Sequence, residues 1–253
     1  VRKKVLVTRP AHQSQLLCQL IEQQGWQARQ FPLIDIQATD LFGQGELYMQ
    51  AIDQYQYVFF VSANAVNFAQ SLFNVKIGPL QNVLCIAVGQ ATCEALSRCG
   101  VTNTLMPAEG FNSEAILTLP ELQSLNGKSC LIVRGEGGRE LLASTLRERG
   151  ALVDYLEVYK RVLPSYESAL INSYLLDKSL AAITIYSGEA LQNLVQILAQ
   201  EKIKKKLLTM PLVVISQRVY ALAKEIGFKH IIIANEASDE AMVNALLNGE
   251  ECG

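Results

Sequence analysis

Short apolar runs alternate along the chain with segments in which apolar residues recur at helical spacing. The runs are rich in valine and isoleucine at consecutive positions, as in strands buried on both faces, and lie at residues 3–9, 57–62, 83–89, 130–135, 181–187, 211–216 and 230–235. After the first run, leucine and isoleucine residues between 16 and 21 follow a helical period, and Gly25 marks the end of that helix. The alternation predicts an α/β fold with parallel sheets.

The same pattern occurs twice, with the second copy displaced by about 125 residues. Arg9 then aligns with Arg134, and Ser62 aligns with Ser187. Four pairs of segments match in the same order: 7–27 with 132–152, 58–72 with 183–197, 86–96 with 213–223, and 112–117 with 238–243. Because chance does not readily produce four ordered matches, we infer an internal duplication of one α/β unit. Two such domains would enclose a cleft, where ligand sites are common.

Composition narrows the class of partner. The chain has 253 residues, enough for two domains, and a formal net charge of −2. So small a charge creates no field that would attract nucleic acid, and an anionic ligand would have to be held by local donors. No apolar run reaches the roughly 18 residues that a membrane-spanning helix needs. We therefore expect a small-molecule ligand, with neither a nucleic-acid nor a membrane partner.

Cysteine usage indicates a reducing compartment and argues against a metal site. No C-x-x-C pair occurs among the six cysteines, which are Cys18, Cys85, Cys93, Cys99, Cys130 and Cys252. Four of them fall within apolar patterns, where a free thiol behaves as a small buried hydrophobic group. The chain begins with a strand-like run rather than a signal peptide. We expect a cytoplasmic protein without a bound metal.

The carboxyl ends of the predicted strands are small, polar or cationic, and ligands of parallel α/β proteins bind at such ends. The serines there suit helix N-caps, which accept hydrogen bonds from first-turn N–H groups. Two interpretations stay open: capping alone, or helix starts that present N–H groups to an anion. The candidate substrate-binding residues are Arg9, Ser62, Asn64, Ala65, Gly89, Thr92, Arg134, Gly135, Gly138, Arg139, Ser187, Gly188, Ser216 and Arg218.

The most distinctive strand end is the glycine-rich segment RGEGGREL at residues 134–141. It lacks the Gly-Lys-Ser/Thr of a P-loop and the G-x-G-x-x-G of a dinucleotide site, which disfavours a nucleotide-dependent transferase. The segment could hold a carboxylate through the N–H groups of the following helix and through Arg134 and Arg139. The plainer alternative is a strand-to-helix turn flanked by surface arginines.

Two further extended runs, residues 32–36 and 156–164, each follow the first βα unit of a repeat. We interpret them as strands that connect the domains. Tyr159 lies in the second run and would either face the cleft or pack within the hinge. No Ser-His-Asp set, catalytic carboxylate pair or H-E-x-x-H motif occurs, so catalysis would not use the common sets of side chains.

Taken in order, the motifs VTRP, FVSANAV, VGQAT and RGEGGRELLASTLRERGALVDYLEVYKR resemble the uroporphyrinogen-III synthase family. The resemblance extends over essentially the whole chain. It implies two similar parallel-sheet α/β domains joined by a two-stranded linker, with the first βα unit of each repeat packed in the domain formed by the other. The implied boundaries are 1–31 with 164–253 for one domain, 39–155 for the second, and 32–38 with 156–163 for the linker strands.

The resemblance also implies the chemistry. The family closes hydroxymethylbilane, a linear tetrapyrrole with eight carboxylates, to uroporphyrinogen III with loss of water and inversion of ring D. The chain would then be a lyase of haem biosynthesis, a cytoplasmic monomer that needs no cofactor. Tyr159 matches a linker tyrosine proposed to donate a proton to the departing hydroxyl, and tyrosine ordinarily keeps its proton at neutral pH. Selection of the attacking carbon would depend on positioning.

One position departs from the family pattern. Val219 stands where many relatives carry a threonine, whereas Thr92 keeps the hydroxyl in the other repeat. Ser216, Arg218 or a backbone group would then replace that contact. The competing hypothesis is a two-domain protein that binds a small anion without catalysis.

Overall fold

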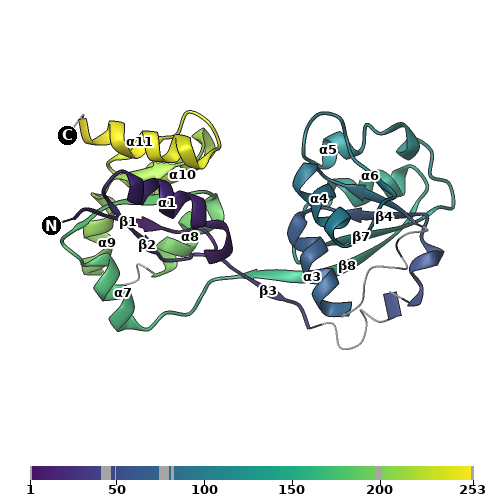
Figure 1. Cartoon of the computed structure of the whole chain (residues 1–253), viewed down its shortest axis with the longest axis horizontal. Helices are drawn as coiled ribbons and strands as arrows, with labels where there is room; N and C mark the ends of the chain where they lie inside the picture. The colour runs from purple at the N-terminus through teal and green to yellow at the C-terminus, as the bar shows by residue number, and fades with distance from the viewer. Residues whose placement is uncertain are drawn as a thin grey trace. The chain divides into compact units, whose positions relative to one another are not determined.

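The computed structural model describes residues 2–40, 47–48, 50–73, 80, 83–197 and 201–251. The chain divides into two units: Val1–Asp35 with Val162–Gly253, and Ile36–Arg161. Each unit is a sheet with helices packed against it (Figure 1). This arrangement confirms the predicted α/β fold with two similar sheets.

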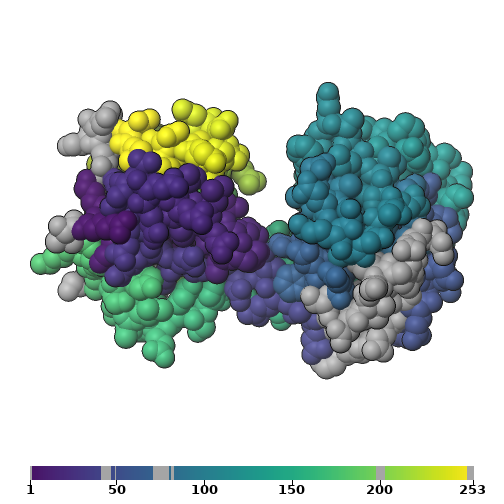
Figure 2. All heavy atoms as spheres, in the orientation of Figure 1, coloured from purple at the N-terminus to yellow at the C-terminus, as the bar shows by residue number. Residues whose placement is uncertain are grey.

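The first unit contains a parallel sheet in the order β11-β10-β9-β1-β2. Its strands are β1 (Lys4–Val7), β2 (Gln27–Gln30), β9 (Leu180–Ile185), β10 (Leu212–Val214) and β11 (Ile231–Ile233). Its helices are η1 (Ala11–Gln13), α1 (Gln15–Gln23), α7 (Ser168–Leu175), α8 (Gly188–Ile197), α9 (Glu201–Leu208), α10 (Gln217–Ile226) and α11 (Asp239–Glu251). Figure 2 shows the amino-terminal segment, in purple, directly against the carboxyl-terminal helix, in yellow.

The second unit contains a sheet in the order β3-β8-β7-β4-β5-β6, in which β8 to β6 are parallel. Its strands are β3 (Asp35–Ala38), β4 (Tyr57–Phe60), β5 (Leu84–Ala87), β6 (Thr104–Leu105), β7 (Ser129–Gly135) and β8 (Leu152–Val162). Its helices are η2 (Ile52–Gln54), α3 (Ala63–Phe73), α4 (Gln90–Arg98), α5 (Ser113–Ile116), η4 (Pro120–Leu122) and α6 (Leu141–Glu148). The strands that carry the chain from unit to unit, β3 and β8, are neighbours in this sheet.

The two sheets repeat one strand order, since β2-β1-β9-β10-β11 corresponds to β8-β7-β4-β5-β6. β1, from the first repeat, pairs with β9 from the second, and β7, from the second repeat, pairs with β4 from the first. Gly25 and Gly150, which align in the duplication, both adopt positive φ after the first helix of their repeat, at 79° and 90°. These features agree with the internal duplication, and each sheet places the first strand of one repeat beside a later strand of the other.

Two-sided burial explains the continuous apolar runs of the second unit. Phe59 and Ile132 face a cluster that includes Leu142 and Leu146 of α6. The next residue along each strand, at positions 60 and 133, faces the opposite cluster, which α3 and α4 cover. Because side chains alternate across a strand, both faces must be apolar when both are covered.

The structure differs from the predicted strands in two respects. β2 and β6 were not predicted, because β2 has the polar sequence QARQ and β6 has only two residues. The first connecting strand begins later than the extended run 32–36 indicates, since β3 begins at Asp35. Leu33 is instead fully buried in the first unit, and its N–H donates to the carbonyl oxygen of Thr8 at 3.0 Å.

Five cysteines are free thiols, and Cys252 lies outside the described residues. Burial raises the pKa of the Cys85 and Cys130 thiols to about 12, so both stay protonated as core residues. Within the described ranges, no helix is both long and apolar enough to cross a membrane. Over the same ranges, no group of three or more His, Cys, Asp or Glu side chains is placed to hold a metal ion.

The central strand β7 should contribute strongly to the stability of the second unit. We expect Leu131→Ala to lower the free energy of unfolding by about 2–5 kcal/mol, because Leu131 is fully buried and its truncation leaves a cavity. Leu152→Ala is the matched control, since Leu152 is 65% exposed, and it should change stability by less than about 0.5 kcal/mol. Urea unfolding followed by circular dichroism measures both. Equal losses in the two variants would contradict the assignment of β7 to the core.

Asp177, just before β9, connects the second repeat to strands β1 and β2 of the first repeat. Lys4 Nζ donates to its Oδ2 at 2.7 Å, and Arg29 lies 3.5 Å from the same oxygen. The hydrogen bond from Lys4, followed by those from Ser179, holds the pKa of the Asp177 carboxyl well below its usual range. A depressed folded-state pKa gives stability that is present above the unfolded value, roughly 3.9, and is lost as pH falls through the folded value.

Asp177→Asn should therefore lower the urea midpoint by a constant amount between pH 7 and about pH 5, with the difference from the parent shrinking below about pH 4. The exposed Asp53 provides the control, Asp53→Asn, which should show a smaller difference. A deficit in Asp177→Asn that grows with acidification would refute this role.

Candidate functional site

A pocket of about 340 Å³ lies in the second unit at the carboxyl ends of β4 and β7. It gathers six of the residues predicted from sequence: Ser62, Arg134, Gly135, Gly138, Arg139 and Tyr159. The sheet register explains why. Phe60 of β4 pairs with Val133 of β7, so the residues that follow both strands emerge at one edge. On the other side of β7, Gly135 pairs with Tyr159 of β8.

Tyr159 packs in the core of the second unit and also lines this pocket. Its side chain is buried, and its ring lies 5.6 Å from that of Phe68 on α3. Its hydroxyl is 3.2 Å from Oγ of Ser62. Ser62 Oγ in turn accepts a hydrogen bond from the N–H of Ala65 at 3.0 Å. The tyrosine hydroxyl is thus connected to the start of α3.

Gly135 is the residue that leaves room for the Tyr159 ring. A Cβ atom at position 135 would lie 2.4 Å from Cε2 of Tyr159, far inside van der Waals contact. The backbone beside it is fixed as well, because the N–H of Glu136 donates to the carbonyl oxygen of Tyr159 at 2.8 Å. A bulge between Arg134 and Gly135 produces this close approach of β7 to β8.

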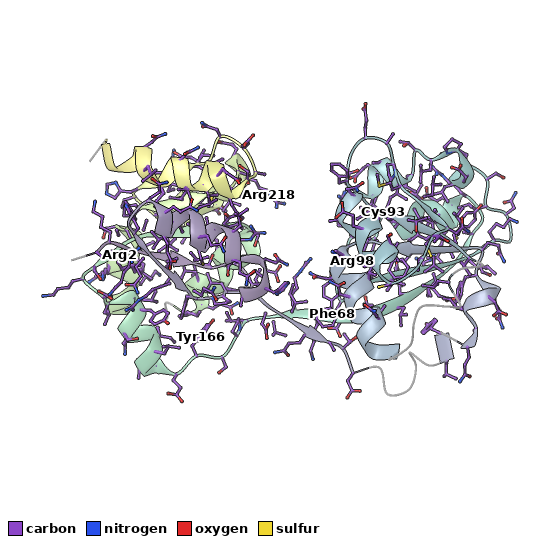
Figure 3. All side chains as sticks on the ribbon, viewed as in Figure 1. Arg2, Phe68, Cys93, Arg98, Tyr166 and Arg218 are labelled. Carbon is purple, nitrogen blue, oxygen red and sulfur yellow. The ribbon has the colours of Figure 1, made fainter. Side chains whose placement is uncertain are left out.

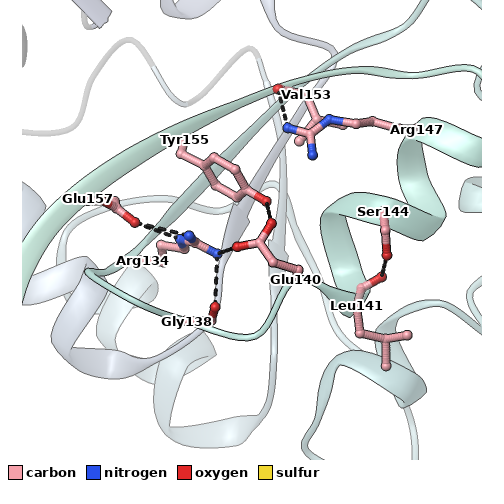
Figure 4. Close-up of polar contacts among 9 residues, drawn as sticks. All are labelled: Arg134, Gly138, Glu140, Leu141, Ser144, Arg147, Val153, Tyr155 and Glu157. Atoms are coloured by element: carbon pink, nitrogen blue, oxygen red, sulfur yellow. Dashed lines mark hydrogen bonds and ion pairs between the residues drawn. The ribbon is translucent and has the colours of Figure 1, made fainter.

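Arg134 is fully engaged by protein groups, as Figure 4 shows. Its Nε and Nη2 contact Oε1 of Glu157 at 3.1 and 3.0 Å. Its Nη1 donates to Oε1 of Glu140 at 3.0 Å and lies 3.4 Å from the carbonyl oxygen of Gly138. The guanidinium also lies 3.9 Å over the ring of Tyr155, and only 9% of the side chain is exposed. Arg134 is therefore not a surface arginine beside a turn.

Glu140 connects the arginine to the next strand. The hydroxyl of Tyr155, on β8, donates to Oε2 of Glu140 at 2.5 Å. The hydrogen bond from Tyr155, followed by that from Arg134, lowers the pKa of the Glu140 carboxyl. The other predicted arginine, Arg139, forms an ion pair with Glu114 of α5 and is largely exposed. Both arginines of the glycine-rich segment thus already contact carboxylates of the protein.

The first unit carries its own set of predicted residues along the carboxyl edge of its sheet. Arg9 Nη1 donates to Oδ1 of Asp239 at 2.7 Å, and its guanidinium lies 4.5 Å over the ring of Tyr186. The Tyr186 hydroxyl donates to the same carboxylate oxygen at 2.5 Å. Burial, reinforced by this hydrogen bond, raises the pKa of Tyr186. Arg9 is therefore also paired within the protein.

Three of the predicted helix caps are confirmed as caps. Oγ of Ser62, Ser187 and Ser216 accepts from the N–H three residues later, at distances of 3.0, 3.1 and 3.5 Å. Gly89 precedes α4 without a side-chain cap, and Gly188 begins α8. The remaining predicted residues of these helix starts are Asn64, Ala65, Thr92 and Arg218, of which Ala65 and Thr92 are buried and Arg218 is exposed (Figure 3).

The departure at position 219 has a packing explanation. Val219 and Thr92 occupy matching places in the first turns of α10 and α4, and their exposed fractions are only 1% and 2%. An inward-facing position tolerates an apolar side chain. A valine there keeps the helix packed against its sheet.

Several residues of the pocket and its surroundings were not among those predicted from sequence. Arg161, Glu136, Gly137 and Ser113 also line the pocket. Arg161 lies two residues after Tyr159, and the period of a strand could have placed both on one face. Three partners of Arg134 were also not predicted. Tyr155 and Glu157 reach it through the register between β7 and β8, and Glu140 reaches it through the path of the loop before α6.

The fold and the pocket define a duplicated two-unit α/β protein with a pocket at the carboxyl ends of parallel strands, where ligands of such proteins bind. The sequence model of the family described as "Uroporphyrinogen-III synthase HemD" matches residues 15–244. The uroporphyrinogen-III synthase of Escherichia coli (strain K12) is 34% identical over 243 residues, covering 96% of this chain and 99% of that relative. The Salmonella typhimurium relative of the same name is 33% identical over 247 residues, with coverages of 96% and 99%.

Solved structures agree at the level of the fold. A mutant uroporphyrinogen III synthase from the extremely thermophilic bacterium Thermus thermophilus has a TM-score of 0.64 at 17% identity, covering 99% of this chain and 100% of that one. The uroporphyrinogen-III synthetase from Helicobacter pylori 26695 has a TM-score of 0.63 at 17% identity, with coverages of 98% and 99%. The chain belongs to the uroporphyrinogen-III synthase family, lyases that cyclise hydroxymethylbilane in haem biosynthesis. This membership does not favour the hypothesis of a non-catalytic binder.

The close approach of Gly135 to Tyr159 gives a testable result. Gly135→Ala should lower the free energy of unfolding by about 1–3 kcal/mol, because its methyl group overlaps the tyrosine ring. Gly138→Ala serves as the control, since its added Cβ would lie an ordinary 3.4 Å from Arg134 Cδ, and it should change stability by less than about 0.5 kcal/mol. Urea midpoints of the two variants decide the matter. Indistinguishable midpoints would show that the ring does not depend on this glycine.

Proposed function

We propose that this chain converts hydroxymethylbilane to uroporphyrinogen III and that the pocket of the second unit receives the hydroxymethyl end of the substrate. In this proposal Tyr159 is the proton donor to the departing hydroxyl. The observation that carries it is the chain of contacts from Ala65 through Ser62 to Tyr159 at the pocket wall. Membership of the family supports the reaction, and this geometry supports the residue.

In this proposal the tyrosine donates into the pocket. Ser62 Oγ accepts from the N–H of Ala65, and it has a proton of its own that it can donate to Tyr159 Oη, 3.2 Å away. With that bond donated by Ser62, the proton of the tyrosine hydroxyl is directed to the departing oxygen. A hydroxyl that is supported in this way is suited to general acid catalysis.

The chemistry that follows needs little more from side chains. The carbon–oxygen bond of the hydroxymethyl group breaks, and the oxygen leaves as water with the proton of Tyr159. The methylene carbon left behind is electrophilic, and its pyrrole nitrogen stabilises the positive charge. A ring D carbon attacks this methylene, and the choice of carbon determines the isomer. Attack by the free carbon gives isomer I, whereas isomer III requires attack by the carbon that carries the bridge to ring C, cleavage of that bridge bond and its re-formation at the free carbon. The ring proton lost on closure returns to Tyr159. The protein therefore contributes mainly by holding one conformation of a flexible chain.

We place the carboxylate contacts at the predicted helix starts and at the loop after β7. First-turn N–H groups suit anions because they lack helical acceptors and lie at the positive end of the helix dipole. Ala65, Thr92 and Val219 already donate within their own turns, so we favour the neighbouring positions Asn64 and Arg218. The other proposed contacts are at Gly89, Gly138, Arg139, Ser187 and Gly188.

We further propose that the protein acts as a cytoplasmic monomer with hydroxymethylbilane as its partner and without a metal or organic cofactor. The near-neutral composition and the free thiols support this setting. Light scattering on the purified protein should give the mass of one chain. A dimer mass would refute the monomer.

Removing the proposed proton donor should slow the reaction without unfolding the protein. We expect Tyr159→Phe to lower kcat by on the order of 10- to 100-fold. This loss is at or below the lower end of what general acid catalysis typically contributes, roughly 100- to 10,000-fold. The ring keeps its contact with Phe68, so the thermal midpoint should change little. Tyr57→Phe is the control, because it removes a hydroxyl of the same unit that contacts the carbonyl oxygen of Glu121 and does not line the pocket.

The assay supplies hydroxymethylbilane and resolves the uroporphyrinogen I and III isomers. Isomer III in excess of the spontaneous isomer I supports the enzyme. Unchanged kinetics in Tyr159→Phe would remove the proton-donor role while leaving the overall activity in place.

A further inference from the structure

Arg134 lies in the wall of the pocket, yet its guanidinium is occupied. All three of its nitrogens contact protein oxygens, those of Glu157, Glu140 and Gly138. The ring of Tyr155 covers one face of the guanidinium. Because Nε and Nη1 are already bonded, Arg134 could hold a substrate carboxylate with two hydrogen bonds only if a resident acceptor were displaced. Direct binding is therefore the less favourable role for Arg134.

The contacts of Arg134 instead fasten the loop between β7 and α6. Nη1 reaches the loop at two points, the carboxylate of Glu140 and the carbonyl oxygen of Gly138. Tyr155 completes the attachment, because its hydroxyl donates to the second oxygen of Glu140 from the neighbouring strand β8. The loop residues 136–139, which line the pocket, thus lie between an anchored strand and an anchored glutamate.

The difference in burial shows which partner depends on the other. The side chain of Arg134 is 9% exposed, whereas that of Glu140 is 62% exposed. Glu140 could extend into solvent at little cost, but a buried guanidinium needs carboxylates close by. Charge-assisted hydrogen bonds of this kind are stronger than neutral ones. The buried charge therefore draws the exposed end of the loop back against the sheet.

The first unit contains a comparable cluster of an arginine, a tyrosine and an acid, although its acid lies outside the loop after β1. Arg9, the duplicate of Arg134, lies over a tyrosine ring and shares a carboxylate with that tyrosine. The carboxylate is that of Asp239, at the start of α11. The tyrosines are not duplicates of one another, since Tyr155 lies in β8 and Tyr186 follows β9. Only the arginine is shared by descent, and each unit supplies its own tyrosine and acid.

We propose that Arg134 is a positioning residue, which acts on substrate binding through Glu140 and the loop 136–139 rather than by holding a carboxylate. The inference rests on the proposed function for its kinetic consequence. It predicts that loss of Glu140 harms binding. If Arg134 were itself a ligand, loss of Glu140 would free its guanidinium and improve binding.

The test is a double-mutant cycle of Arg134→Ala and Glu140→Gln, with KM for hydroxymethylbilane as the readout. We expect Glu140→Gln alone to raise KM by on the order of 5-fold and Arg134→Ala by on the order of 10-fold, with the double variant within about twofold of Arg134→Ala. A merely smaller folded fraction would lower apparent kcat and leave KM unchanged. Glu148→Gln, an exposed residue on the same helix α6, is the control and should keep the parental KM.

The opposite pattern would overturn the proposal. A KM that stays level or falls in Glu140→Gln, or effects of the two changes that multiply in the double variant, assigns Arg134 to the substrate. If Arg134→Ala does not fold, Tyr155→Phe replaces it, because it removes a hydrogen bond to Glu140 and keeps both the ring and Arg134. That variant should raise KM in the same direction as Glu140→Gln, and an unchanged KM counts against the proposal.

Amide hydrogen exchange separates this inference from the proposed reaction. The peptide covering residues 135–141 should exchange on the order of 10-fold faster in Glu140→Gln than in the parent or in Glu148→Gln. Unchanged exchange refutes the fastening of the loop, whatever the activity. If exchange is faster in Glu140→Gln but the parent protein forms no isomer III, the role of Glu140 in holding the loop stands and the proposed reaction is rejected.

Discussion

The pocket depends on the close packing of three neighbouring strands, β8, β7 and β4, at their carboxyl ends in the second sheet. β8 brings Tyr159 against the bare backbone of Gly135 on β7, and β4 ends where Ser62 meets the tyrosine hydroxyl. Any side chain at position 135 would occupy the space of the ring. Because Gly135 has no side chain, the Tyr159 ring can lie against β7, and this position brings its hydroxyl to the pocket.

The arginines at the strand ends of this protein form ion pairs with nearby carboxylates. The net charge is only −2, and the arginines at the ends of β1 and β7 are paired with the protein's own carboxylates. Recognition of a polyacidic tetrapyrrole would therefore rest on helix starts and loop backbone more than on free cations. Many such contacts, each weak, suit a ligand whose conformation must be fixed. In the proposed account, Arg134 holds the loop backbone that makes some of these contacts.

The parts that could be predicted from sequence are those encoded in local patterns. Strands such as β4 and β7 are covered on both faces, so their apolar runs are continuous and visible. The serine caps follow from residue type and place. β2 was not predicted, because its sequence QARQ is polar and forms no apolar run. The later start of the first connecting strand was not predicted, because it depends on a hydrogen bond from Leu33 to Thr8, which is distant in the sequence. Tyr159 was singled out by resemblance, and the partners of Arg134 depend on register, which no local pattern encodes.

The most direct measurement is a crystal structure with an unreactive hydroxymethylbilane analogue bound. The account predicts that the hydroxymethyl oxygen, or its replacement, lies within hydrogen-bond distance of Tyr159 Oη, while Arg134 keeps its contacts to Glu140 and Glu157. An analogue whose reacting end lies away from Tyr159, or one that draws Arg134 out of its pairs to hold a carboxylate, would contradict the account.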